Sequence, residues 1–199
     1  MGTKKASPSP VIAARIGSCR EQMAKHRLPA YLITNRRDTF YLCGFTGEDS
    51  AVLITARAVH VVSDARFDQA IDNEVPWARK HLRKGLLIDE IGALVSRLRI
   101  ERLGVQTESM TVAMHGGLRK AARPTRIVNA PPITAMLRRC KDATELKVLN
   151  RAIAVAQDAF KATRRSIRVG QTEREVAARL EYEMRNGLVT THFTNIKCG

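Results

Sequence analysis

The chain has 199 residues, of which 34 are Lys or Arg and 19 are Asp or Glu, so its formal net charge is +15. Apolar residues make up 44% and charged residues 27%, which are proportions of a folded globular protein rather than of a disordered or fibrous one. No apolar run approaches the ~20 residues of a membrane-spanning helix, and the N-terminus lacks the apolar segment of a secretory signal. We therefore expect a cytoplasmic protein without a membrane segment, with room for one domain and part of a second.

The first 132 residues alternate short apolar strands with amphipathic helices. After a disordered segment over residues 1–10, the patterns predict a helix at Val11–Leu28, a strand at Ala30–Ile33, a short helix through Phe40 and Leu42, a hairpin of strands Ala51–Ile54 and Val59–Val62, a helix at Ala65–Asp72, a strand at Val75–Ala78, a helix at Asp89–Ile100, a strand at Arg102–Val105, a helix at Thr111–Ala122 and a strand at Ile127–Val128. This alternation predicts an α/β domain over residues 11–132, with a mixed sheet flanked by helices.

Residues 133–199 have a different pattern, in which two amphipathic helices dominate. The first begins at a capping box at Asp142, and its apolar residues form one stripe over residues 146–160. The second is predicted to end at Asn186-Gly187, and Phe193–Ile196 is the one strand predicted after it. A single strand offers two helices little surface to pack against. We therefore interpret residues 133–199 as a linker and the start of a second domain.

The sequence shows no group of residues with the spacing of a metal site or of a nucleophile beside its base. The four cysteines and five histidines are scattered, so we expect reduced, structural thiols. The best internal metal candidates are Asp64, Asp68 and Asp72, which follow one another at steps of four, as on one face of a helix. Acidic residues early in a helix also face solvent and complement its dipole, and we favour that interpretation. We therefore predict no metal ligand and no catalytic residue in this chain.

Five segments carry recognisable motifs in a fixed order. They are Phe40–Gly47 (FYLCGFTG), Ser63–Ala70 (SDARFDQA), Leu103–Met110 (LGVQTESM), Leu137–Leu146 (LRRCKDATEL) and Ile167–Val176 (IRVGQTEREV). In residues, order and spacing they resemble the Xaa-Pro peptidases, namely aminopeptidase P and prolidase, with their non-peptidase relative creatinase. The last two motifs are the most specific, and they contain one departure, Val169, where the family usually has proline.

The resemblance implies a creatinase/prolidase-type N-terminal domain, followed by the first two helices of a truncated pita-bread domain. In the complete family enzyme, two divalent metals (Mn, Co or Zn) bound by two Asp, one His and two Glu activate water for attack on the bond before proline. Those ligands would lie beyond residue 199, so no cofactor is expected in this chain. The expected function is that of a non-catalytic part, inactive alone, that acts in dimerisation and shapes the substrate cleft. Its expected partner is a second copy or a separately encoded catalytic domain, and proline-containing peptides would be substrates only of the completed enzyme.

The resemblance also makes four residues candidates for a lip of the substrate cleft, namely Asp38, Phe45, Thr46 and Glu48. The alternative for them is plain loop and core packing, above all for Phe45. The alternative function for the chain is a basic nucleic-acid-binding module, which its positive charge would suit. That charge is spread along the chain, however, and aromatic residues that could stack on bases make up only 5%. We therefore favour the peptidase interpretation.

Overall fold

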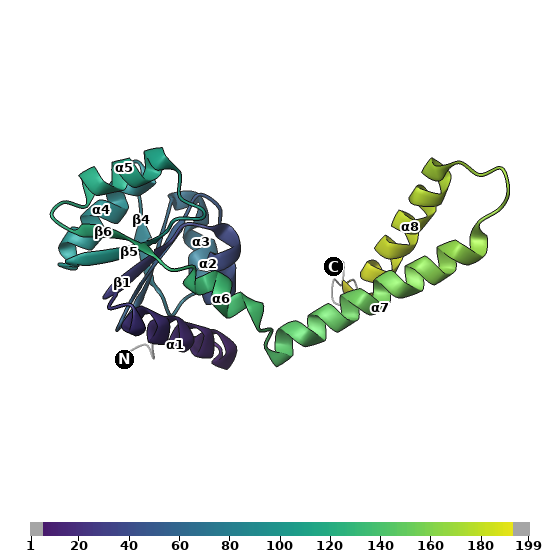
Figure 1. The fold of residues 1–199 in the computed structure, drawn as a ribbon, viewed down its shortest axis with the longest axis horizontal. Helices are drawn as coiled ribbons and strands as arrows, with labels where there is room; N and C mark the ends of the chain where they lie inside the picture. Colours follow the sequence, from purple (N-terminus) through teal and green to yellow (C-terminus); the bar gives the residue numbers. More distant parts are fainter. Residues whose placement is uncertain (1–5, 193–199) are drawn as a thin grey trace. The chain divides into compact units, whose positions relative to one another are not determined.

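The computed structural model describes residues 6–192, and the chain divides into two compact units, Met1–Cys140 and Lys141–Gly199. The first unit is a six-stranded sheet with helices on both faces (Figure 1). Its elements in chain order are α1 (Pro10–Lys25), β1 (Ala30–Ile33), α2 (Arg36–Cys43), β2 (Ala51–Thr55), β3 (Val59–Ser63), the 3-10 helix η1 (Ala65–Phe67), α3 (Asp68–Glu74), β4 (Arg79–Leu82), α4 (Leu87–Arg97), β5 (Arg102–Gln106), α5 (Val112–Ala121), β6 (Arg126–Ala130) and α6 (Ile133–Arg139). The predicted α/β fold with a mixed sheet is confirmed.

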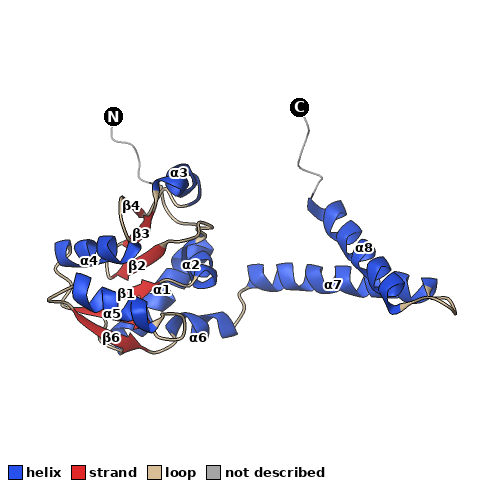
Figure 2. Ribbon diagram, turned by 90° about the horizontal axis from the view of Figure 1, so that it is seen from above, coloured by secondary structure: helices blue, strands red, loops and turns tan. Residues whose placement is uncertain are grey.

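The strands lie in the order β4-β3-β2-β1-β5-β6, with β4 and β6 at opposite edges (Figure 2). Strand β2 runs antiparallel to β1 and β3, whereas the pairs β1–β5, β5–β6 and β3–β4 are parallel. The carboxyl ends of five strands therefore lie together with the start of β2, at what we call the carboxyl end of the sheet. The chain passes from β1 toward β4 and later returns to β5 on the other side of β1. The strand order thus reverses between β1 and β5.

Two hydrophobic cores cover the two faces of this sheet. In β1, Tyr31 and Ile33 pack with residues of α1, α2, α3 and α6, whereas Ala30 and Leu32 pack with residues of α4 and α5. All four side chains are fully buried. Burial on both faces explains why this strand appears in the sequence as an unbroken apolar run rather than as an alternating one.

The second unit consists of α7 (Ala143–Ser166) and α8 (Glu173–His192), which pack against each other. The capping box predicted at the start of α7 is confirmed, because Asp142 Oδ1 accepts from the Glu145 N–H at 2.9 Å and the Glu145 carboxylate accepts from the Asp142 N–H at 3.1 Å. Along the predicted apolar stripe, Leu149, Ile153 and Phe160 are between 43% and 58% exposed. Much of this stripe is therefore uncovered in the described part of the chain.

Two predicted boundaries are wrong. The strand expected at Val75–Ala78 forms instead at Arg79–Leu82, because Val75 caps α3, with its N–H bonded to the Ile71 carbonyl, and the following Pro76 has no N–H to give to a sheet. The last helix does not end at Asn186-Gly187 but continues to His192. A Cβ on Gly187 would lie 2.8 Å from Val155 Cγ1, so this glycine permits the close approach of α7 and α8.

The remaining differences from the predicted elements lie at the end of the first unit and at the two ends of the chain. Helix α6 was not predicted, although Ile133 at its start is only 1% exposed and the helix contacts α1 and α2. The strand expected at Phe193–Ile196 and the first half of the disordered segment expected over residues 1–10 lie outside the described residues. The end of that segment is ordered, because Ser9 caps α1 and Pro10 begins it. Among residues 6–192, no helix combines the length and the apolar character needed to cross a membrane.

Candidate functional site

A buried polar cluster lies at the carboxyl end of the sheet, where the strand order reverses. Gln106, the last residue of β5, is 0% exposed, and its Oε1 accepts from the N–H groups of Thr34 at 3.2 Å and Asn35 at 3.4 Å, just after β1. Its Nε2 donates to Asp38 Oδ2 at 2.6 Å, and Asp38 Oδ1 accepts from Arg138 at 2.9 Å. Open α/β sheets commonly bind ligands at this point. Here the chain's own side chains occupy it, and they tie α2 to α6.

The loop that follows α2 is held between the core and α3. It begins at Gly44, whose φ of 81° lies in the left-handed region that glycine adopts without strain. Phe45 then turns into the core, where its ring meets Phe67 edge to face with centroids 6.2 Å apart. The Thr46 N–H and hydroxyl donate to the two Glu74 oxygens at 2.8 Å and 2.7 Å. These contacts fix the position of the loop.

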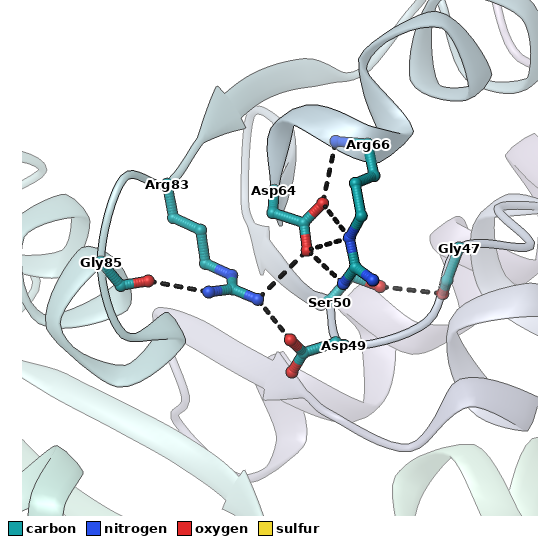
Figure 3. A network of polar contacts seen from close by, with 7 residues as sticks. All are labelled: Gly47, Asp49, Ser50, Asp64, Arg66, Arg83 and Gly85. Carbon is teal, nitrogen blue, oxygen red and sulfur yellow. Dashed lines mark hydrogen bonds and ion pairs between the residues drawn. The ribbon is translucent and has the colours of Figure 1, made fainter.

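Beside this loop, two carboxylates and two guanidinium groups form a network (Figure 3). Arg83 bridges Asp49 and Asp64, lying 3.2 Å from Asp64 Oδ2, and also donates to the Gly85 carbonyl at 2.8 Å. Arg66 donates to both Asp64 oxygens, with a shortest distance of 2.7 Å. These hydrogen bonds lower the pKa of Asp64. The two carboxylates balance the charge of the two guanidinium groups. Because Asp49 lies in the loop, Asp64 follows β3 and Arg83 follows β4, the network ties the loop to the ends of these two strands.

The four predicted lip residues divide into two pairs. Asp38 and Phe45 are buried, with exposed fractions of 6% and 0%, so they support the loop from within. Thr46 and Glu48 are exposed, and Glu48 pairs with Arg36 at 2.5 Å, with both of these side chains more than 60% exposed. Of the four, Thr46 and Glu48 are therefore the ones placed to contact a molecule outside the domain.

The three acidic residues considered for a metal do not lie on one helix. Asp64 caps η1 and is bonded to Arg66, whereas Asp68 begins α3. Asp68 and Asp72 both accept from the Lys80 ammonium, at 2.7 Å for Asp72, so a side-chain cation already sits between them. The described part of the chain holds no group of three or more His, Cys, Asp or Glu side chains arranged to bind a metal. The inference of one shared helix face is wrong.

A histidine pair, which no motif of the sequence indicates, joins β3 and β4. His60 Nδ1 lies 2.9 Å from His81 Nε2, and the rings are stacked with centroids 5.1 Å apart. His60 is 2% exposed, and burial together with the nearby His81, Arg79 and Arg97 lowers its pKa to about 4. Burial also lowers the pKa of His81. The pair is therefore neutral at physiological pH, with one ring donating and the other accepting.

This pair should make the fold sensitive to acid. A lowered histidine pKa means that the unfolded chain takes up protons first, so the stability is fully present above about pH 6.5 and is lost as the pH falls toward 4. We expect the free energy of unfolding to fall by about 2 kcal/mol between pH 7 and pH 4.5 through this pair. Urea unfolding at several pH values measures it. The variant His60→Gln should lose most of this dependence, and an unchanged pH profile in that variant would refute the assignment.

Comparisons with known proteins agree with the fold. Residues 15–140 match the Creatinase/Prolidase N-terminal domain family. The chain is 28% identical over 155 residues to the uncharacterized peptidase YqhT of Bacillus subtilis, which covers 78% of this chain and 44% of that protein. It is 26% identical over 180 residues to the Xaa-Pro dipeptidase of Pyrococcus horikoshii, covering 88% and 49%. The chain thus spans about half the length of the curated relatives it matches.

Solved structures give the same result. The Xaa-Pro dipeptidase from Bacillus anthracis superposes with a TM-score of 0.82 at 26% identity, over 88% of this chain and 49% of that one. An X-Pro aminopeptidase from Thermotoga maritima superposes with a TM-score of 0.74 at 27% identity, over 84% and 49%. The matched family model covers the whole sheet and its covering helices from residue 15 onward. The chain therefore belongs to the creatinase/prolidase N-terminal domain family.

Proposed function

We propose that this chain is the N-terminal, non-catalytic part of an Xaa-Pro peptidase of the aminopeptidase P or prolidase type. Its role is to shape the substrate cleft and to contact a second copy or a separately encoded catalytic domain. The observation that carries this proposal is the likeness over 88% of the chain to the Bacillus anthracis dipeptidase. Residues 11–132 would form the N-terminal domain, and residues 133–199 the linker and the start of the catalytic domain.

The acidic residues of this chain support a non-catalytic role. The complete enzymes would bind two divalent metals, Mn, Co or Zn, through clustered carboxylates and a histidine, and these metals would activate water. The acidic residues best spaced for such a site do not fit it, because Asp64 is bonded to Arg66 and Asp68 and Asp72 share Lys80. We therefore assign no hydrolytic step to these residues.

The exposed stripe on α7 supports the placement of the second unit. Leu149, Ile153 and Phe160 lie on one helix and are 43%, 52% and 58% exposed. Apolar side chains that gather on one helix face usually pack against another surface. The rest of a catalytic domain would supply that surface, since the chain matches only 49% of the Bacillus anthracis dipeptidase.

The lip proposal rests on Thr46 and Glu48, which the braced loop presents at the surface. The Glu48 side chain is 66% exposed despite its pairing with Arg36. A carboxylate at the mouth of a cleft would attract the α-amino group of a short peptide. Asp38 and Phe45 would act indirectly, by holding the loop in place.

A chimera tests the lip. Residues 15–140 of this chain would replace the matching domain of the Bacillus anthracis dipeptidase, and Xaa-Pro dipeptide hydrolysis would be measured. We expect Glu48→Gln to raise KM about threefold and to leave kcat unchanged, because it removes an interaction made equally in the ground and transition states. The control is Glu21→Gln, which removes the same charge from an exposed position on α1. Equal KM values for the two variants would contradict the lip assignment.

A further inference from the structure

A basic groove lies between α5 and the edge strand β6, in a part of the fold that the proposed function does not use. Its volume is about 820 Å³, and four cationic side chains line it: Arg119, Lys120, Arg123 and Arg126. No Asp or Glu is among its lining residues. Within the described residues, none of the four cations has an ion pair or a side-chain hydrogen bond, in contrast to Arg36, Arg66 and Arg83. The groove therefore holds an uncompensated positive charge.

The backbone of β6 is open along the same groove. The Arg126 N–H donates to the Glu101 carbonyl at 2.8 Å. In a parallel pair, every second residue of a strand bonds to the same neighbouring strand, so Arg126 and Val128 bond to β5. Ile127 and Asn129 alternate with these residues, so their N–H and C=O groups point away from β5. Because β6 is the edge strand, these groups have no hydrogen-bond partner in the described part of the chain. An open edge of this kind can pair with an added strand.

We propose that β6 and the basic groove bind an acidic, extended segment of a partner protein, which adds to the sheet beside β6. The main chain of the segment would bond to Ile127 and Asn129, and its carboxylates would lie against the four cations. The open strand edge favours a peptide over a nucleic acid, since its donors and acceptors match another strand. No Phe, Tyr or Trp lines the groove, and His115 is the one ring among its lining residues, so a run of bases would find no row of aromatic side chains to stack on.

Fluorescence anisotropy with the full chain tests the charge contribution. The probe is a labelled peptide of alternating Glu and Val, about ten residues long, with binding measured at about 0.05 M and 0.3 M salt. Replacing two cations by Arg119→Gln and Arg126→Gln should weaken binding about tenfold at low salt. The matched control, Arg164→Gln with Arg165→Gln, removes the same charge from exposed positions on α7 and should leave binding unchanged. Absence of peptide binding, or equal losses in both double variants, would overturn the proposal.

A second variant tests strand addition separately from charge. Asn129→Pro keeps all four cations and removes one outward N–H without breaking a bond to β5, so it should weaken binding about fivefold. In the unchanged chain, peptide should slow hydrogen exchange at Ile127 and Asn129, and this readout does not depend on how any variant folds. Binding that is insensitive to Asn129→Pro, without such protection, would overturn strand addition. Tighter binding of a single-stranded oligouridylate than of the peptide would replace it with nucleic-acid binding.

Discussion

Replacing Asp38 by alanine should lower the free energy of unfolding by about 3 kcal/mol. Asp38 is 6% exposed and receives hydrogen bonds from Gln106 at 2.6 Å and Arg138 at 2.9 Å. Its removal leaves the Gln106 amide, on a fully buried side chain, without that acceptor. It also removes the contact through which Arg138 ties α6 to α2, two residues before Cys140, where the first unit ends. Urea unfolding monitored by circular dichroism measures the loss.

The control for this prediction is an ion pair of similar chemistry at the surface. Glu48→Ala breaks the pair with Arg36, in which both side chains are more than 60% exposed. An exposed pair of this kind contributes less than about 1 kcal/mol, because water solvates both charges when they separate. Similar losses for Asp38→Ala and Glu48→Ala would show that the buried cluster does not stabilise the domain.

The second large effect is expected at Gly92, where α4 packs closely on α5. A Cβ at this position would lie 2.6 Å from the backbone carbonyl carbon and oxygen of Ala121, which cannot move aside as a flexible side chain can. Gly92→Ala should therefore force the two helices apart and lower the free energy of unfolding by about 3 kcal/mol. The change in thermal or urea unfolding gives the value.

Gly116 in α5 provides the matched control. It is also a helical glycine, but an added Cβ there would meet nothing within 4 Å. Gly116→Ala should stabilise the domain by about 0.5 to 1 kcal/mol, since alanine loses less backbone entropy than glycine in a helix. The same substitution is thus expected to act with opposite signs at the two sites. A stabilising Gly92→Ala would contradict the close packing of α4 on α5.

The order of strands and helices in the first unit could be predicted because burial on both faces leaves a local record. Ala30–Ile33 is apolar throughout, and amphipathic helices separate such runs. Features that depend on distant pairing left no such record. Asp38 and Gln106 are 68 residues apart and meet only because β1 pairs with β5. Likewise, the stacking of His60 on His81 depends on the register of β3 and β4.

The site was harder to predict than the fold for a further reason. The sequence identified Phe45 and Thr46 through a motif, but a motif does not say which of its side chains points inward. In the sequence, Arg119 and Arg126 are part of a positive charge that is spread along the chain. Their common placement in one groove without partners becomes visible only once the ion pairs elsewhere in the fold are known.

The most direct measurement is an Xaa-Pro hydrolysis assay of the 199-residue chain itself. The purified chain would be incubated with Mn²⁺, Co²⁺ or Zn²⁺ and with an Xaa-Pro dipeptide or a longer Xaa-Pro peptide, with the Bacillus anthracis dipeptidase as the positive control. We predict no release of proline or of the N-terminal residue above the protein-free blank under conditions in which the control is active. Metal-dependent hydrolysis that is abolished by a chelator would contradict a non-catalytic role for this chain.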